Sequence, residues 1–121
     1  MKIYFNPVDT RRWNMFEEVL GIGHIEDFYA VKSMEIGDIM LLHVGSHDNR
    51  YKSGVYAAGV VVTEPFEKER LRVLVRITQI QRVTPIITTA EVWKFNQQFR
   101  SVHMIDPQYY DKIMQYLDAD C

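Results

Sequence analysis

Two stretches in the middle of the chain have the apolar pattern of core strands. Residues 39–44 form a short apolar run, and residues 54–63 form a longer one that contains Gly54 and Gly59. The nine residues between them, 45–53, are polar and include a histidine, an aspartate, an arginine and a lysine. Apolar runs bounded by turn residues are typical of buried strands. The pattern therefore predicts a hairpin whose polar loop is a candidate ligand-binding region.

Alternation of apolar and polar residues predicts three further strands. Residues 71–80 alternate most regularly and predict a half-buried strand. Residues 2–5 predict a short strand that ends at Asn6-Pro7, because proline has no amide proton to donate to a sheet. Residues 99–105 predict the last strand of the chain.

Helices are predicted near both ends of the chain. Asp9 or Thr10 is expected to cap a helix over residues 11–20. A second helix is expected over residues 26–34, because apolar residues recur there every three positions and an acidic pair stands at its start.

Two later helices have stronger start signals. Thr88 and Glu91 have the spacing of a capping box and predict a short helix that leads into Trp93. Asp106 followed by Pro107 predicts the start of a final helix that runs to about residue 117.

These elements predict one α+β domain that spans residues 1–121. Residues 39–80 hold three strands with no helix between them, which disfavours parallel winding through helical crossovers. The expected architecture is a curved, mostly antiparallel sheet or small β-barrel flanked by helices.

Composition narrows the functional classes. The formal net charge of -2 gives no global attraction to nucleic acid or to an anionic membrane. No apolar run is long enough to span a bilayer, so no membrane partner is expected. The single cysteine, Cys121, excludes an internal disulfide and fits a reducing cytoplasm. Without a cysteine cluster or a phosphate-binding glycine motif, no cofactor is expected.

Aromatic and histidine residues supply the candidate chemistry. Trp13 follows the first strand and is either a core aromatic or one wall of an aromatic pocket that stacks on a nucleobase. Trp93 has the same two interpretations, with packing favoured by the neighbouring Phe95. His43 and His47 are four residues apart, but a strand end and a loop do not place them as a helix would, so no metal is expected. His43 is interpreted as a hydrogen-bonding residue at the core edge or as a donor in a pocket.

Basic residues form local groups along the chain, and no catalytic constellation accompanies them. The groups are Arg11 and Arg12; Arg50 and Lys52; Lys68, Arg70, Arg72 and Arg76; and Arg100. They form either a mixed-charge surface or a rim that contacts phosphates. Because no serine or cysteine has an identifiable base partner, a binding domain is favoured over an enzyme.

Five segments, taken in order, resemble EVE domains of the PUA-like superfamily. They are FNPVDTRRW, the turn MEIGD with the strand IMLLHV, the strand GVYAAGVVVTEPF, the strand LRVLVRI, and the closing FRSVHMIDPQYYDKIMQYL. The resemblance implies a curved sheet flanked by helices. It also implies binding of DNA or RNA with a modified base held in an aromatic pocket, as related YTH domains hold methylated adenine, and a use in sensing or defence.

The same resemblance implies the residues of the binding site. The matching positions are Asn6, Pro7 and Trp13; His43, Val44, Gly45 and Ser46; and Phe99, Arg100 and Ser101. Two other functions remain open. The related ASCH domains suggest a small hydrolase or ribonuclease with lysine, threonine and glutamate in its cleft, and a protein-interaction module is the third hypothesis.

Overall fold

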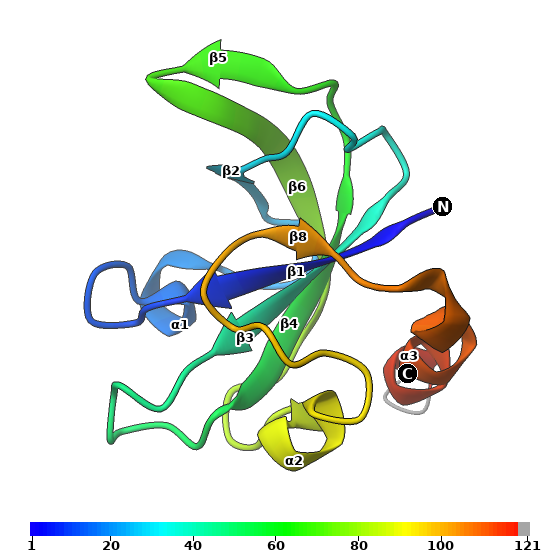
Figure 1. Cartoon of the computed structure of the whole chain (residues 1–121). Coiled ribbons are helices and arrows are strands. Elements are labelled where there is room, and N and C mark those ends of the chain that lie inside the picture. Colours follow the sequence, from blue (N-terminus) through cyan, green and yellow to red (C-terminus); the bar gives the residue numbers. More distant parts are fainter. Residues whose placement is uncertain (119–121) are drawn as a thin grey trace.

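One curled sheet organises the protein (Figure 1). The computed structural model describes residues 1–118, so Cys121 lies outside the described residues. The strands are β1 (Ile3–Val8), β2 (Ile25–Tyr29), β3 (Ile39–Val44), β4 (Gly54–Val61), β5 (Phe66–Lys68), β6 (Arg70–Ile80), β7 (Ile87–Thr88) and β8 (His103–Met104). The helices are α1 (Met15–Glu18), α2 (Thr89–Val92) and α3 (Tyr110–Asp118), and the 3-10 turn Pro107–Tyr109 leads into α3.

The strand order confirms the predicted fold class. The main path is β2-β6-β4-β3-β1-β8, with β5 paired to β6 and β7 paired to β4. β1 and β3 are parallel, while the pairs along the rest of this path are antiparallel. The protein is therefore an α+β domain whose curled, mostly antiparallel sheet forms a half-barrel flanked by short helices.

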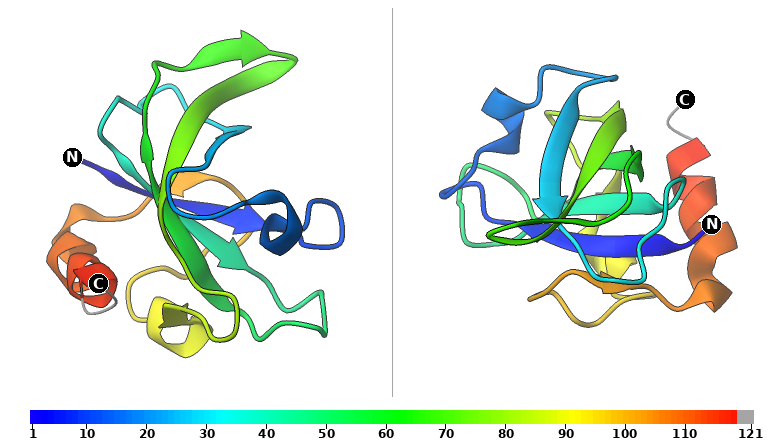
Figure 2. Two further views of the ribbon diagram at one scale, coloured as in Figure 1. Left: turned by 180° about the vertical axis from the view of Figure 1, so that it is seen from behind. Right: turned by 90° about the horizontal axis from the view of Figure 1, so that it is seen from above.

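Both faces of the sheet are apolar. Alternate residues of a strand point to opposite sides, and consecutive residues of β1 and β3 are apolar and buried. On β1 and β3, Tyr4 and Leu42 belong to the cluster inside the curl, which also holds Phe28 of β2. Phe5 and Leu41 belong to a second cluster on the outer face, where residues of α2 and α3 pack. In Figures 1 and 2, α1 lies beyond the carboxyl end of β1 and α3 lies near its amino end.

The strongest sequence signals are confirmed. The central hairpin forms as β3 and β4, and the alternating stretch forms β6. The Thr88 hydroxyl accepts a hydrogen bond from the Glu91 amide (3.3 Å) and caps α2. Asp106 caps the turn that precedes α3 by accepting from the Gln108 amide (3.1 Å).

The first predicted helix is wrong in length and in its cap. Instead of a helix over residues 11–20, the chain makes a turn and then the four-residue α1. Asn14, not Asp9 or Thr10, is the cap, since its side chain accepts from the Phe16 amide (3.0 Å). An asparagine side chain competes with the backbone for hydrogen bonds, which favours caps over helix interiors.

The second predicted helix is wrong, because residues 25–29 form strand β2. Phe28 lies opposite Val73 of β6, and Asp27 lies 3.2 Å from the Arg72 guanidinium of the same strand. The long strand β6 thus provides a pairing partner and a cross-strand ion pair that outweigh the local helical spacing.

Two strand boundaries also differ from the prediction. β1 continues through Asn6 and Pro7 to Val8 rather than ending at the proline. β8 pairs only with Tyr4 and Phe5, so Pro7 lies beyond it at an edge position that tolerates proline. The strand expected over residues 99–105 is limited to β8, and its first residues form a bend. No helix in residues 1–118 has the length and apolar character needed to cross a membrane.

Candidate functional site

Two neighbouring cavities lie at the carboxyl end of β1. The first cavity has a volume of about 570 Å³ and is formed by the end of β1, the loop after β3, α2 and the segment around Phe99. The second cavity, of about 730 Å³, lies between the carboxyl half of β1 and the edge strand β2. Both are in the size range of small-molecule pockets. Pro7, Val8, Asp9 and Arg100 line both cavities and form the boundary between them.

Aromatic rings form one wall of the first cavity. The ring centroids of Trp93 and Phe99 are 5.0 Å apart, and those of Phe99 and His43 are also 5.0 Å apart. Phe5 supports both rings from the core, with its centroid 5.1 Å from His43 and 5.5 Å from Phe99. Trp93 is 52% exposed, so part of its ring remains free for a planar ligand.

His43 reaches the first cavity from the carboxyl end of β3. It follows Leu41 on the outer face of β3, while its neighbour Val44 points into the inner core. The His43 side chain is almost fully buried, and this burial lowers its pKa to about 4, so the ring is neutral at pH 7. His43 Nε2 lies 3.0 Å from the hydroxyl of Thr89, the first residue of α2.

Charge at the boundary between the cavities is mostly internally paired. The Asp9 carboxylate accepts two hydrogen bonds from the Arg11 guanidinium (3.1 and 3.0 Å), and these hold the pKa of Asp9 below its usual range. The guanidinium of Arg100, which is exposed, forms no ion pair with another residue of the described chain. Arg100 is thus a cation available to a ligand at the entrance of either cavity.

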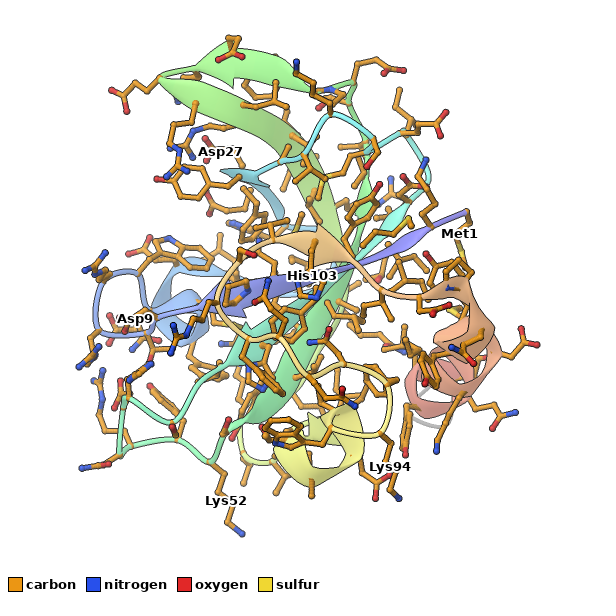
Figure 3. The ribbon with its side chains drawn as sticks, in the orientation of Figure 1. Met1, Asp9, Asp27, Lys52, Lys94 and His103 are labelled. Atoms are coloured by element: carbon orange, nitrogen blue, oxygen red, sulfur yellow. The ribbon has the colours of Figure 1, made fainter. Side chains whose placement is uncertain are left out.

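The loop after β3 is fixed rather than free. Asp48 is buried, accepts a hydrogen bond from the Thr10 hydroxyl (2.8 Å) and pairs with the Arg50 guanidinium (2.7 Å). These bonds hold the loop against the turn that follows β1. Arg50, one of the predicted rim cations, therefore serves with Asp48 to position the cavity wall. Lys52, before β4, and Lys94, after α2, extend into solvent (Figure 3).

The second cavity lies along the seam of the half-barrel, which is the gap where the carboxyl half of β1 and the edge strand β2 do not pair with each other. Trp13 lines it and packs edge-on against Phe28, with centroids 5.6 Å apart. The guanidinium carbons of Arg70 and Arg72 lie 4.5 and 4.7 Å from the centroid of the Tyr29 ring. Figure 3 labels two carboxylates of this cavity, Asp9 near the end of β1 and Asp27 on β2.

The residues predicted as one site are divided between the two cavities. The first cavity contains Pro7, His43, Gly45, Ser46, Phe99 and Arg100. The second contains Asn6, Pro7, Trp13, Arg100 and Ser101. Val44 is buried in the inner core and lines neither cavity, because adjacent residues of a strand point to opposite faces. Trp13 and His43 do not face each other across one cleft, contrary to the sequence-based expectation.

The predicted site omits six residues that line the first cavity: Val8, Asp9, His47, Ser53, Thr89 and Trp93. Trp93 supplies its exposed aromatic surface, and Thr89 and Ser53 supply hydroxyl groups beside His43. The capping box at Thr88 does indicate that Thr89 begins a helix. Nothing in the local sequence indicates that this helix packs beside the end of β3. Within residues 1–118, no cluster of three histidine, cysteine or acidic side chains has the geometry to hold a metal ion.

Comparisons with known proteins identify the fold but no family. No protein-family model matches the chain, and no curated protein matches it in sequence. A hypothetical protein from Leishmania major has a similar structure, with a TM-score of 0.68 and 13% identity over 98% of this chain and 96% of that chain. Rpa0253 from Rhodopseudomonas palustris gives a TM-score of 0.66 and 11% identity, covering 96% of this chain and 92% of the other.

A third similar structure is PSPTO5229 from Pseudomonas syringae. Its TM-score is 0.63 and its identity 11%, with 93% of this chain and 97% of that chain covered. All three chains match nearly end to end, so the curled sheet with its flanking helices is a fold that recurs in proteins of low sequence identity.

Proposed function

We propose that the protein is a nucleic-acid-binding module that recognises a modified base of DNA or RNA in the first cavity. The observation that carries this proposal is the convergence of Trp93, Phe99 and His43 beside the unpaired cation of Arg100. Planar aromatic faces bind nucleobases by stacking, and a guanidinium at the entrance suits the phosphate that accompanies the base. The reducing cytoplasm is the compartment we propose, and sensing of modified DNA or RNA, as in defence, is the use that the EVE resemblance suggests.

The second cavity offers a path for the rest of the strand. It adjoins the first cavity at Arg100 and adds Arg12 and Arg70. Its three carboxylates have partners of their own: Asp9 pairs with Arg11, Asp27 with Arg72, and Glu26 with His24. A base in the first cavity would thus place its neighbouring phosphates near arginines, with Trp13 as a stacking surface for the adjacent base.

Binding in this way requires the base to leave its stack. Extrusion of a base costs a few kcal/mol, and stacking with edge hydrogen bonds in a closed pocket offsets that cost. The overall negative charge of the chain keeps sequence-independent attraction small, so recognition depends on the cavity itself.

The hydrolase hypothesis requires a lysine, a threonine and a glutamate in one cleft. Among the described residues, the first cavity contains Thr89 without lysine or glutamate, and the second contains Glu26 without lysine or threonine. No observation therefore favours this alternative or the protein-interaction module over a nucleic-acid reader.

Titration of fluorescent oligonucleotides tests the proposal. Matched strands, each with one modified base (5-methylcytosine or N6-methyladenine) or none, are bound to the wild-type protein and to Trp93→Ala. We expect tighter binding of at least one modified strand. We expect Trp93→Ala to weaken that binding by about 1–3 kcal/mol, because it removes one stacking face.

Leu20→Ala is the control, since Leu20 is 84% exposed and lines neither cavity. It should bind as the wild type does. Equal, salt-sensitive binding of modified and unmodified strands would refute base recognition, and so would an unchanged affinity of Trp93→Ala.

A further inference from the structure

Three hydrogen bonds connect the His43 ring to the backbone beneath the first cavity. His43 Nε2 lies 3.0 Å from Thr89 Oγ1. Thr89 Oγ1 lies 2.7 Å from Ser53 Oγ, and Ser53 Oγ lies 3.0 Å from the carbonyl oxygen of Val44. This series of hydrogen bonds therefore begins at the imidazole and ends at the Val44 carbonyl, which can only accept a hydrogen bond.

This order fixes the position of the proton in each of the three hydrogen bonds. Because the Val44 carbonyl only accepts, the Ser53 hydroxyl must donate to it. Ser53 Oγ then has its lone pairs free and accepts the proton of Thr89. Thr89 has no second proton, so its oxygen accepts from His43 Nε2, which must carry a hydrogen. The neutral ring is held as the Nε2–H tautomer.

The second ring nitrogen, Nδ1, is consequently a bare acceptor. His43 is only 2% exposed, and Nδ1 receives no hydrogen bond from residues 1–118. Nδ1 is also not among the polar atoms that are sealed from solvent without a partner. Its contact with solvent is therefore through the first cavity, which His43 lines. A buried acceptor that faces a cavity requires a donor from whatever fills it.

We propose that His43 makes the first cavity selective for ligands that present an N–H group to Nδ1, and that it excludes bases whose inserted edge has lost every N–H. This inference rests on the proposed function and specifies its ligand chemistry. N6-methyladenine retains one N–H on its amino group, whereas N6,N6-dimethyladenine has none. Thymine retains the N–H of its N3, whereas 3-methylthymine does not. A donorless edge would place a methyl group against Nδ1 in place of the N–H and leave Nδ1 without a hydrogen-bond donor.

The tautomer can be read in the free protein, without any nucleic acid. Long-range ¹⁵N–¹H correlation spectra at pH 7 distinguish a protonated ring nitrogen from an unprotonated one. We expect His43 to show a protonated Nε2 and an unprotonated Nδ1. A protonated Nδ1 would overturn this inference and leave the proposed function standing.

The selectivity is tested with two matched pairs of nucleosides, used as such or placed in an oligonucleotide. The pairs are N6-methyladenosine with N6,N6-dimethyladenosine, and thymidine with 3-methylthymidine. Within the pair that binds, we expect the donorless member to bind at least about tenfold more weakly. Equal binding within the pair refutes the inference alone. If neither pair binds, this inference fails; base recognition fails with it only if the 5-methylcytosine strand is not bound either.

Two conservative variants separate hydrogen bonding from simple size. Thr89→Val removes the acceptor of Nε2–H, and Ser53→Ala frees the Thr89 proton to turn toward the ring. Either change permits a proton on Nδ1, so the difference within a pair should shrink several-fold and both tautomers should appear in the spectra. Thr84→Val is the control, because Thr84 is exposed and lines neither cavity. An undiminished difference in Thr89→Val and Ser53→Ala would show that bulk, not the tautomer, excludes the donorless base.

Discussion

The two cavities at the end of β1 differ in what encloses them. The first lies on the close-packed outer face, where Phe5 fixes the rings of His43 and Phe99 by direct contact. The second lies where the sheet stops pairing, and its lining contains four arginines and three carboxylates. A wall of packed rings has a defined shape, whereas long charged side chains adapt to what they bind. Selectivity is therefore expected in the first cavity and general strand affinity in the second.

The largest effect expected from this difference is a pH dependence that belongs to the first cavity. His43 has a pKa of about 4 when folded and about 6.5 when unfolded. Between these values the unfolded chain binds the proton and the folded protein does not. Stability therefore is retained above pH 6.5 and falls as the pH approaches 4, by about 3 kcal/mol.

Urea unfolding at a series of pH values measures this contribution. The free energy of unfolding of His43→Gln should decline less between pH 6.5 and 4 than that of the wild type. His47→Gln removes an exposed histidine of the same cavity and should follow the wild type. Parallel curves for the wild type and His43→Gln would contradict the assignment of a buried neutral ring.

A smaller effect is expected at the backbone beneath the first cavity. A Cβ on Gly54 would lie 2.6 Å from Pro85 Cβ and 2.7 Å from the Ile87 carbonyl oxygen, so Gly54→Ala must displace β7. We expect a loss of about 1–3 kcal/mol in the free energy of unfolding. We also expect weaker ligand binding in the first cavity, since β7 leads directly to Thr89.

Gly45→Ala is the matched variant, because its Cβ would meet only His47 Cδ2 at 3.5 Å, an ordinary contact. Its stability should remain within about 0.5 kcal/mol of the wild type. Comparable losses in both variants would mean that the contact of Gly54 with β7 does not limit the cavity.

The smallest expected effect concerns the boundary between the cavities. Arg100→Ala should reduce the slope of log K against log salt concentration by about 0.7–0.9, the change for one phosphate contact. Preference for the modified base should remain, because the ring wall is intact. Arg76→Ala, an exposed residue that lines neither cavity, should leave the slope unchanged. If Arg100→Ala instead abolished the preference for the modified base, the assignment of selectivity to the ring wall of the first cavity would be wrong.

The sequence predicts the fold better than it predicts the site. β3, β4 and β6 have patterns that hold over many residues, and their pairing follows from short connections. The site depends on which face each side chain occupies and on which distant segments meet. Alternation along a strand already implies that His43 and Val44 cannot both face one cavity. The meeting of Trp93 with Phe99 depends on the bend after α2, which no local pattern specifies.

Errors in the first half of the chain have a similar origin. Residues 26–34 have apolar spacing that suits a helix, yet Phe28 is buried by pairing with β6, more than 40 residues later in the chain. Local helical spacing and pairing with a distant strand compete there. Pairing prevails because it also gives Asp27 an ion pair with Arg72 of β6. Trp13 lines the second cavity, because the curl of the sheet places it in the seam rather than beside His43.

The first cavity is assembled from three segments that are far apart along the chain: residues 7–9, 43–53 and 89–100. During synthesis, the first two segments leave the ribosome well before the third, so the growing chain has no aromatic wall and no partner for His43 Nε2 until α2 follows. Pairing of β1 is also delayed, because its neighbours β3 and β8 are both synthesised later. Chains that end before residue 100 therefore lack the complete first cavity, which forms only when its three segments have been made and have folded together.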